Sequence, residues 1–119
     1  MNGITAYKEN SVTTQSRGML VVLLYEGAIK FLNQAIVELE AGRFVEKGQY
    51  INKAIDIINE LDVSLNMEIK GGVAENLRKL YLFMIAHLNK ANFQRDPQMV
   101  RQVIGMLDDL VSAWKAISQ

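Results

Sequence analysis

The stretch MLVVLLYEGAIKFLNQAIVEL, residues 19–39, decides the fold. Fifteen of its 21 residues are apolar or Tyr, more than the roughly three apolar positions per heptad of an ordinary core-facing helix. Glu26, Lys30 and Glu38 interrupt it, and each charge at the centre of a membrane-spanning helix costs about 2.5 to 3.5 kcal/mol. We therefore interpret it as the buried helix of a soluble protein, without membrane insertion. The excess of apolar surface predicts either a central helix that contacts all others or a surface that receives a partner segment.

The segments on either side of this stretch predict a helical bundle. Ser16 is a predicted N-cap, Gly42 a helix stop, Gly71-Gly72 a reversal and Asp96-Pro97 a helix start. The expected helices span about residues 17–41, 44–67, 73–93 and 97–118. Residues 1–15 show no regular period and are expected to form an extended or partly mobile arm. The fold class predicted is all-α: an antiparallel up-down-up-down four-helix bundle over residues 16–119, with an N-terminal arm.

Composition excludes several classes of function. The chain has 119 residues, which argues for one domain, and no Cys, which excludes disulfides and Cys-based metal sites. Its 13 basic residues balance 13 acidic ones, so a nucleic-acid partner is not expected. The polar first eighteen residues carry no signal-peptide pattern.

No catalytic or metal-binding constellation emerges. Asp108 and Asp109 are adjacent on a helix and point about 100° apart, so they cannot act as one dyad. Lys70-Gly71-Gly72 lacks the spacing of a phosphate-binding loop. His87, the one His, could accept phosphate in a four-helix phosphotransfer domain, with Lys90 one turn away, but its place beside core positions favours a boundary residue. We expect no enzyme, no cofactor and no metal.

The order of short motifs resembles the FliS family of flagellar secretion chaperones. Residues 23–29, LLYEGAI, resemble the family's Met-Leu-Tyr-Asp-Gly-Ala-Ile, and TQS at 14–16 resembles its Thr-Ala-Ser. Further matching pieces, in order, are KG at 47–48, INKA at 51–54, IINEL at 57–61, GGVA at 71–74, NL at 76–77, LY at 80–81, AN at 91–92, and Leu107, Leu110 and Ala113-Trp114. Arg17 departs from the Pro that often follows the capping Ser, and His87 stands where the family often carries a basic residue.

The resemblance implies a cytoplasmic export chaperone. Such a protein binds the disordered C-terminal segment of flagellin, prevents its premature polymerisation and keeps it competent for export. The resemblance also implies that the N-terminal arm, through Tyr7 and Val12, covers part of the flagellin site or contacts flagellin. Export-apparatus components or a co-chaperone are further partners that these residues do not specify.

Four apolar positions beside the expected core stripes are the candidate groove residues: Tyr25, Ile29, Ile57 and Ile104. Gly27 and Gly105 lie inside expected helices, where each costs about 1 kcal/mol relative to Ala. They predict either close helix packing or a notch for a partner backbone. The alternative function is a helical adaptor that binds another amphipathic partner.

Overall fold

The described part of the chain forms four helices and no strand. The computed structural model describes the backbone of residues 3–68 and 72–118, and the side chains of residues 18–65 and 72–117. The helices are α1 (Gly3–Glu40), α2 (Phe44–Glu68), α3 (Gly72–Gln94) and α4 (Pro97–Ser118). The predicted all-α four-helix fold is confirmed. The glycine pair expected to reverse the chain after α2 falls partly outside the described residues.

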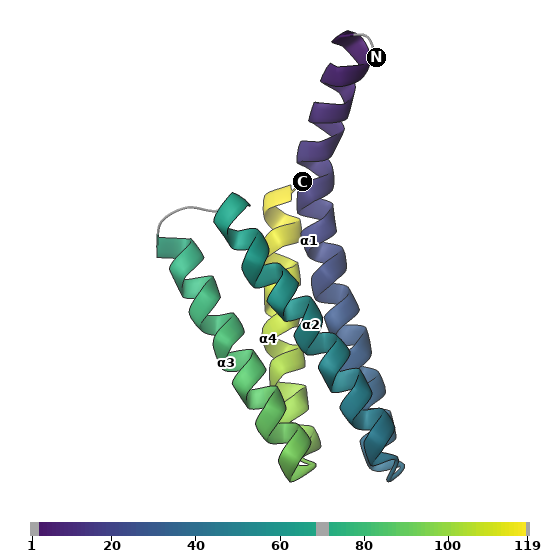
Figure 1. The fold of residues 1–119 in the computed structure, drawn as a ribbon. Coiled ribbons are helices and arrows are strands. Elements are labelled where there is room, and N and C mark those ends of the chain that lie inside the picture. The colour runs from purple at the N-terminus through teal and green to yellow at the C-terminus, as the bar shows by residue number, and fades with distance from the viewer. Residues whose placement is uncertain (1–2, 69–71, 119) are drawn as a thin grey trace.

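Figure 1 shows the helices running alternately up and down. In the described parts, α1 packs on α2 and α4, and α3 packs on the same two helices, so α1 and α3 lie on opposite corners of the bundle. The apolar first helix therefore packs closely on two helices and reaches α3 through one side-chain pair, Tyr25 with Tyr81, so it contacts every other helix without being central. A helix at one corner buries only the sector that faces its two neighbours, so the rest of its apolar surface faces outward.

The core follows the 3.6-residue period on all four helices. The largest fully buried side chains are Tyr25, Leu32, Ile51, Ile58, Leu61, Tyr81, Met84, Leu88, Val100, Val103 and Leu107. On α1 the buried side chains are those of Val21, Val22, Tyr25, Ala28, Leu32, Ala35, Ile36 and Leu39. Val73 and Ile117 are exposed because they lie in the first turn of α3 and near the end of α4.

Both of the connections that the structure describes end their helix in the same way. Gly42, with φ +76°, places its N–H on the Leu39 carbonyl at 3.1 Å, and the next N–H bonds to the Glu38 carbonyl. The connection after α3 repeats this pattern with Arg95 at φ 54°. The Asp96 carboxylate then accepts the Gln98 N–H at 2.9 Å, which confirms the predicted cap of α4.

Side chains join these two connections at one end of the bundle. Lys47, buried at the start of α2, donates to the Asn92 carbonyl at 3.0 Å and to the Asn92 side chain. Burial, and then the charge of Arg95, lowers the pKa of Lys47. The Arg95 guanidinium lies 3.7 Å from the centre of the Phe44 ring. The α1–α2 hairpin is thus tied to the α3–α4 hairpin at this end.

The N-terminal part of α1 differs from the sequence prediction. The helix begins at Gly3, so the predicted start at Ser16 and the extended arm are wrong for residues 3–15. No Pro or Gly interrupts residues 4–17, and a helix already nucleated in the bundle can propagate through Ser and Thr at a cost of only a few tenths of a kcal/mol each. Figure 1 shows this part of α1 projecting beyond the other helices. The chain is correspondingly long, with extents of 56 × 31 × 22 Å.

Candidate functional site: the outer face of α1

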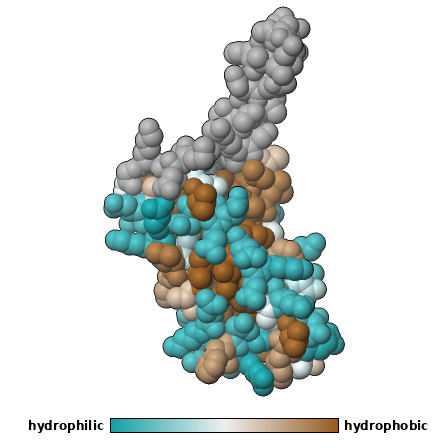
Figure 2. Space-filling model, viewed as in Figure 1, coloured by the Kyte–Doolittle hydropathy of each residue, from teal (hydrophilic) through white to brown (hydrophobic). Residues whose placement is uncertain are grey.

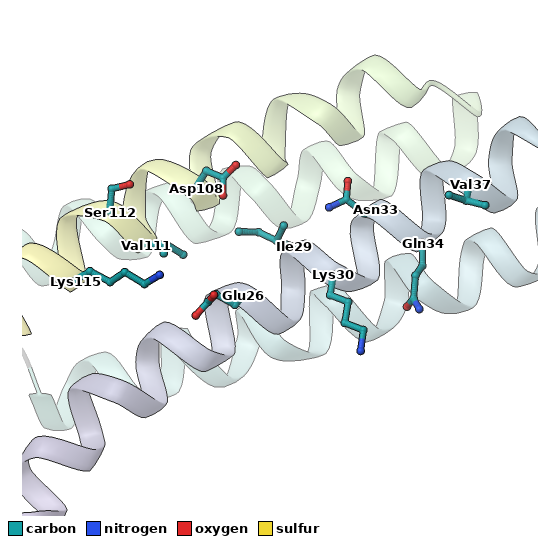
Figure 3. Close-up of a pocket in the computed structure, with 10 residues that line it drawn as sticks. All are labelled: Glu26, Ile29, Lys30, Asn33, Gln34, Val37, Asp108, Val111, Ser112 and Lys115. Carbon is teal, nitrogen blue, oxygen red and sulfur yellow. The ribbon is translucent and has the colours of Figure 1, made fainter.

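A groove of about 760 Å³ runs between α1 and α4. Its lining residues come from both helices at helical spacing: Glu26, Ile29, Lys30, Asn33, Gln34 and Val37 from α1, and Asp108, Val111, Ser112 and Lys115 from α4. In Figure 3, Ile29 and Val111 lie in the space between the two helices, and Glu26 and Lys115 point into its end nearer the projecting part of α1. The groove therefore combines an apolar centre with charges of both signs.

The groove continues onto an apolar surface of α1. Met19 and Leu23 precede Glu26 at spacings of seven and three residues, so they share its face of the helix. Both are more than half exposed, as is Val37 at the other end of the groove. From Met19 to Val37 this face spans about 27 Å at 1.5 Å per residue, the length of a helix of five turns. We call it the α1 face.

Large apolar side chains that stay in water on a soluble protein mark contact surfaces more often than chance. Figure 2, which looks onto α2 and α3, shows hydrophobic side chains gathered at the end from which α1 projects and between α2 and α3. The α1 face is thus one of several places where the described surface is apolar.

The candidate groove residues from the sequence do not form one site. Ile29 lines the α1–α4 groove. Ile57 belongs to α2 and is half-buried on the other side of α1, where α1 and α2 meet. Ile104 is half-buried on α4, one turn before Asp108, and is not among the groove-lining residues. Tyr25 is fully buried, so its expected exposure is wrong. The side chains of Tyr7 and Val12 lie outside the described residues.

Tyr25 belongs to a buried polar cluster. Its hydroxyl is hydrogen-bonded to the Tyr81 hydroxyl, and the two ring centres are 6.4 Å apart. Trp114 also bonds to the Tyr25 side chain. Burial raises the pKa of Tyr25 despite these hydrogen bonds, and burial together with the Tyr25 bond raises the pKa of Tyr81. Both phenols stay neutral at physiological pH, so this pair links α1 to α3 through the core.

The seam between α1 and α2 is closed by packing. A Cβ added at Gly27 would lie 3.5 Å from Ile57 Cδ1, an ordinary contact distance, so the two helices approach closely there. Phe31 stacks on Tyr50, and Lys53 lies 5.4 Å from the Phe31 ring centre. The close-packing interpretation of Gly27 is supported.

Gly105 has no such explanation. A Cβ there would meet no described atom within 4 Å, so neither of the helices beside α4 approaches it closely. The close-packing interpretation is therefore wrong for Gly105.

His87 is held by the bundle. Its Nε2 lies 2.6 Å from Gln102 Oε1 on α4, and its ring stacks on Phe83 at 5.1 Å. A ring nitrogen engaged in this way is less accessible to a phosphodonor, which supports the boundary interpretation over phosphotransfer. Over residues 3–68 and 72–118, no group of three or more His, Asp or Glu could hold a metal ion.

Sequence reasoning missed Met19, Leu23 and the polar residues of the groove. Their signal was the excess of apolar residues over one core stripe in residues 19–39. The segment Gly18–Glu40 is also long and apolar enough to cross a membrane, a test that a buried helix of a soluble protein passes as well. Here α1 packs against α2 and α4 and supplies a large part of the core.

Together, the bundle and the α1 face define a helical protein with a surface suited to an amphipathic segment. The family model "Flagellar protein FliS" matches residues 1–119. The chain is 40% identical to a Flagellar secretion chaperone FliS of Salmonella typhimurium, over 98% of this chain and 90% of that protein. It is 39% identical to the protein of that name from Vibrio cholerae (96% and 87% covered) and 35% identical to that of Bacillus subtilis (99% and 87%).

The chain belongs to the FliS family of flagellar secretion chaperones. This is a chaperone family and not an enzyme family.

Proposed function

We propose that this chain binds the C-terminal segment of flagellin in the cytoplasm, prevents its premature polymerisation and keeps it competent for export. Family membership supports a flagellar export substrate as partner. The observation that carries the proposal is the α1 face, on which Met19, Leu23 and Val37 stay exposed on a helix that is otherwise part of the core.

The α1 face suits recognition of a helix in a groove. An amphipathic segment can place its apolar residues over Ile29 and Val111 and against Met19 and Leu23. Glu26, Lys30, Asp108 and Lys115 would then pair with the polar edges of the segment and fix its register. A segment that is disordered before it binds loses conformational entropy on binding, so its affinity per unit of buried area is modest and release remains feasible.

Calorimetric titration tests the partner. Full-length flagellin is titrated into the chain, beside flagellin that lacks its C-terminal segment. The proposal expects saturable binding that disappears with the deletion, measured at two temperatures because the binding enthalpy can pass through zero. Binding that survives the deletion would place the contact elsewhere on flagellin. No binding, with retained affinity for another cytosolic protein, would favour the adaptor alternative.

A pair of matched valines tests the surface. Val37→Ser and Val63→Ser each remove an exposed valine, the first from the α1 face and the second from α2. We expect Val37→Ser and Leu23→Ser each to weaken flagellin binding about fivefold to thirtyfold, the effect of roughly 1 to 2 kcal/mol of lost apolar burial. Val63→Ser should bind like the wild type. Equal effects of the two valine changes would remove the α1 face from the proposal.

The N-terminal segment is proposed as a cap or as a contact, and one deletion separates the two roles. A cap lowers the apparent affinity by the fraction of capped molecules, so deletion of residues 1–15 tightens flagellin binding. If Tyr7 contacts flagellin, deletion weakens binding, and Tyr7→Ala in the full chain reproduces part of the loss.

A further inference from the structure

α3 carries a second apolar surface, at the corner of the bundle opposite α1. Leu82, Phe83 and Phe93 are exposed, and Phe93 is 89% exposed, more than any other large apolar side chain among the described residues. Leu82, Ala86 and Phe93 follow the spacing i, i+4 and i+11, so they form one ridge about 16 Å long. Phe83 lies beside this ridge. Figure 2 shows hydrophobic side chains interrupting the polar surface over α3.

Basic residues accompany the ridge. Lys79 and Lys90 are exposed, and their spacing from Leu82 and Phe83 places them in the same sector of the helix. α3 has three basic residues and one acidic residue, Glu75, which lies in its first turn. α2, by contrast, has two basic and five acidic residues. We call the set Lys79, Leu82, Phe83, Ala86, Lys90 and Phe93 the α3 stripe.

We propose that the α3 stripe binds an amphipathic partner helix whose polar edge is acidic, at a site separate from the α1 face. Three to four turns of such a helix match the ridge from Leu82 to Phe93. Its apolar residues would cover Leu82 and Phe93, and its carboxylates would face Lys79 and Lys90. Because α1 and α3 occupy opposite corners, the chain can hold this helix and an export substrate at the same time.

Charge distinguishes this occupant from two others. A second copy of the chain, docked stripe to stripe about a two-fold axis, would bring Lys79 and Lys90 near their own equivalents, and like charges at an interface oppose association. Binding to an anionic membrane surface is typical of clusters of about four to eight basic residues, and the stripe has two. An acidic helix satisfies both the apolar ridge and the lysines.

The test uses a synthetic probe because the natural partner is unidentified. The probe is an 18-residue fluorescent peptide with Leu at positions i, i+3, i+4 and i+7 and Glu on the flanks, beside a peptide in which every Glu is Lys. Fluorescence anisotropy with the full chain should show saturable binding of the acidic peptide, with the basic peptide at least tenfold weaker. Phe93→Ser should weaken the acidic peptide at least tenfold, and the double change Lys79→Glu with Lys90→Glu should reverse the preference.

Controls keep the outcome interpretable. Phe93 and the lysines are exposed, so circular dichroism should show unchanged helicity in these variants. Leu23→Ser should bind the acidic peptide like the wild type, and Phe93→Ser should bind flagellin like the wild type, which separates the two surfaces. Equal binding of the two peptides, or no loss with Phe93→Ser, would overturn the proposal. Dimerisation through the α3 stripe, detected by sedimentation, would also overturn the proposal. So would co-sedimentation of the chain with phosphatidylserine vesicles, if Phe93→Ser abolishes it and neither peptide binds.

Discussion

At the scale of single residues, the buried hydroxyl pair of Tyr25 and Tyr81 links two helices that make no other close approach in the described bundle. A buried hydroxyl left without its partner costs about 1 to 3 kcal/mol, whereas removing both hydroxyls together can be nearly neutral. The pair is thus a sensitive point of the core.

Tyr81→Phe should lower the free energy of unfolding by about 1 to 2 kcal/mol, because the Tyr25 hydroxyl loses its partner on α3. The double variant Tyr25→Phe with Tyr81→Phe should lose less than the sum of the single changes. Urea unfolding followed by circular dichroism measures these values. Tyr50→Phe, on a half-buried ring, is the control and should change stability by less than about 0.5 kcal/mol. If the double variant lost as much stability as Tyr25→Phe and Tyr81→Phe together, the two hydroxyls would not interact.

Arg95 combines an unfavourable backbone conformation with a favourable contact. A left-handed residue other than Gly costs about 1 to 2 kcal/mol, and a cation over a partly exposed ring contributes about 0.5 to 1 kcal/mol. Arg95→Gly should therefore change the free energy of unfolding little in the wild type. In the Phe44→Ala variant, which lacks the ring contact, the same change should raise the free energy of unfolding by about 0.5 to 1 kcal/mol more than it does in the wild type. A double-mutant cycle in urea measures the difference. The same effect in both backgrounds would mean that the ring contact contributes nothing.

At the scale of single helices, α4 contains a glycine that no close packing explains. Gly105→Ala should stabilise the protein by about 1 kcal/mol, because Ala has the higher helix propensity and the added Cβ meets no described atom within 4 Å. Thermal unfolding should show a Tm higher by about 4 °C. Gly27→Ala, whose Cβ would contact Ile57, serves as comparison and should gain less. A stabilised Gly105→Ala protein that has lost flagellin binding would revive the notch interpretation for this position.

Local signals predicted the end of α1 and the start of α4 well, but they predicted the start of α1 and its angular placement poorly. Asp96-Pro97 and Gly42 act through their own backbone and caps, so sequence alone locates them. On α1, apolar residues stand on most sides of the helix over residues 19–39, so periodicity could not show that Tyr25 faces inward while Leu20 and Leu23 face outward. That choice depends on which neighbours α1 has, a property of the whole bundle. The left-handed Arg95 gave no sequence signal, since Gly is the usual residue there.

At the scale of the whole molecule, the projecting part of α1 is separate from the bundle that holds the core. Figure 1 shows its backbone extending past the ends of the other helices. Deletion of residues 1–15 should therefore leave a cooperative unfolding transition and change the free energy of unfolding by less than about 1 kcal/mol. Urea unfolding of the two chains tests this. A loss of several kcal/mol would show that the N-terminal segment packs on the bundle in solution.

The ties between the two hairpins have a consequence for how the native protein opens. Lys47, Asn92, Phe44 and Arg95 join the two hairpins at one end. Toward the opposite end, the Tyr25–Tyr81 hydroxyl pair joins α1 to α3, and an exposed Arg78–Asp62 ion pair at 3.2 Å, a kind of pair that contributes little stability, joins α3 to α2. Local opening should then begin at the end without these ties, and amide hydrogen exchange should be slowest near residues 47–58 and 84–103 and faster toward the last turns of α4. A uniform exchange profile along α4 would contradict this gradient. The faster-exchanging end is also where Met19 and Leu23 lie, so the amides there should slow most when an export substrate binds.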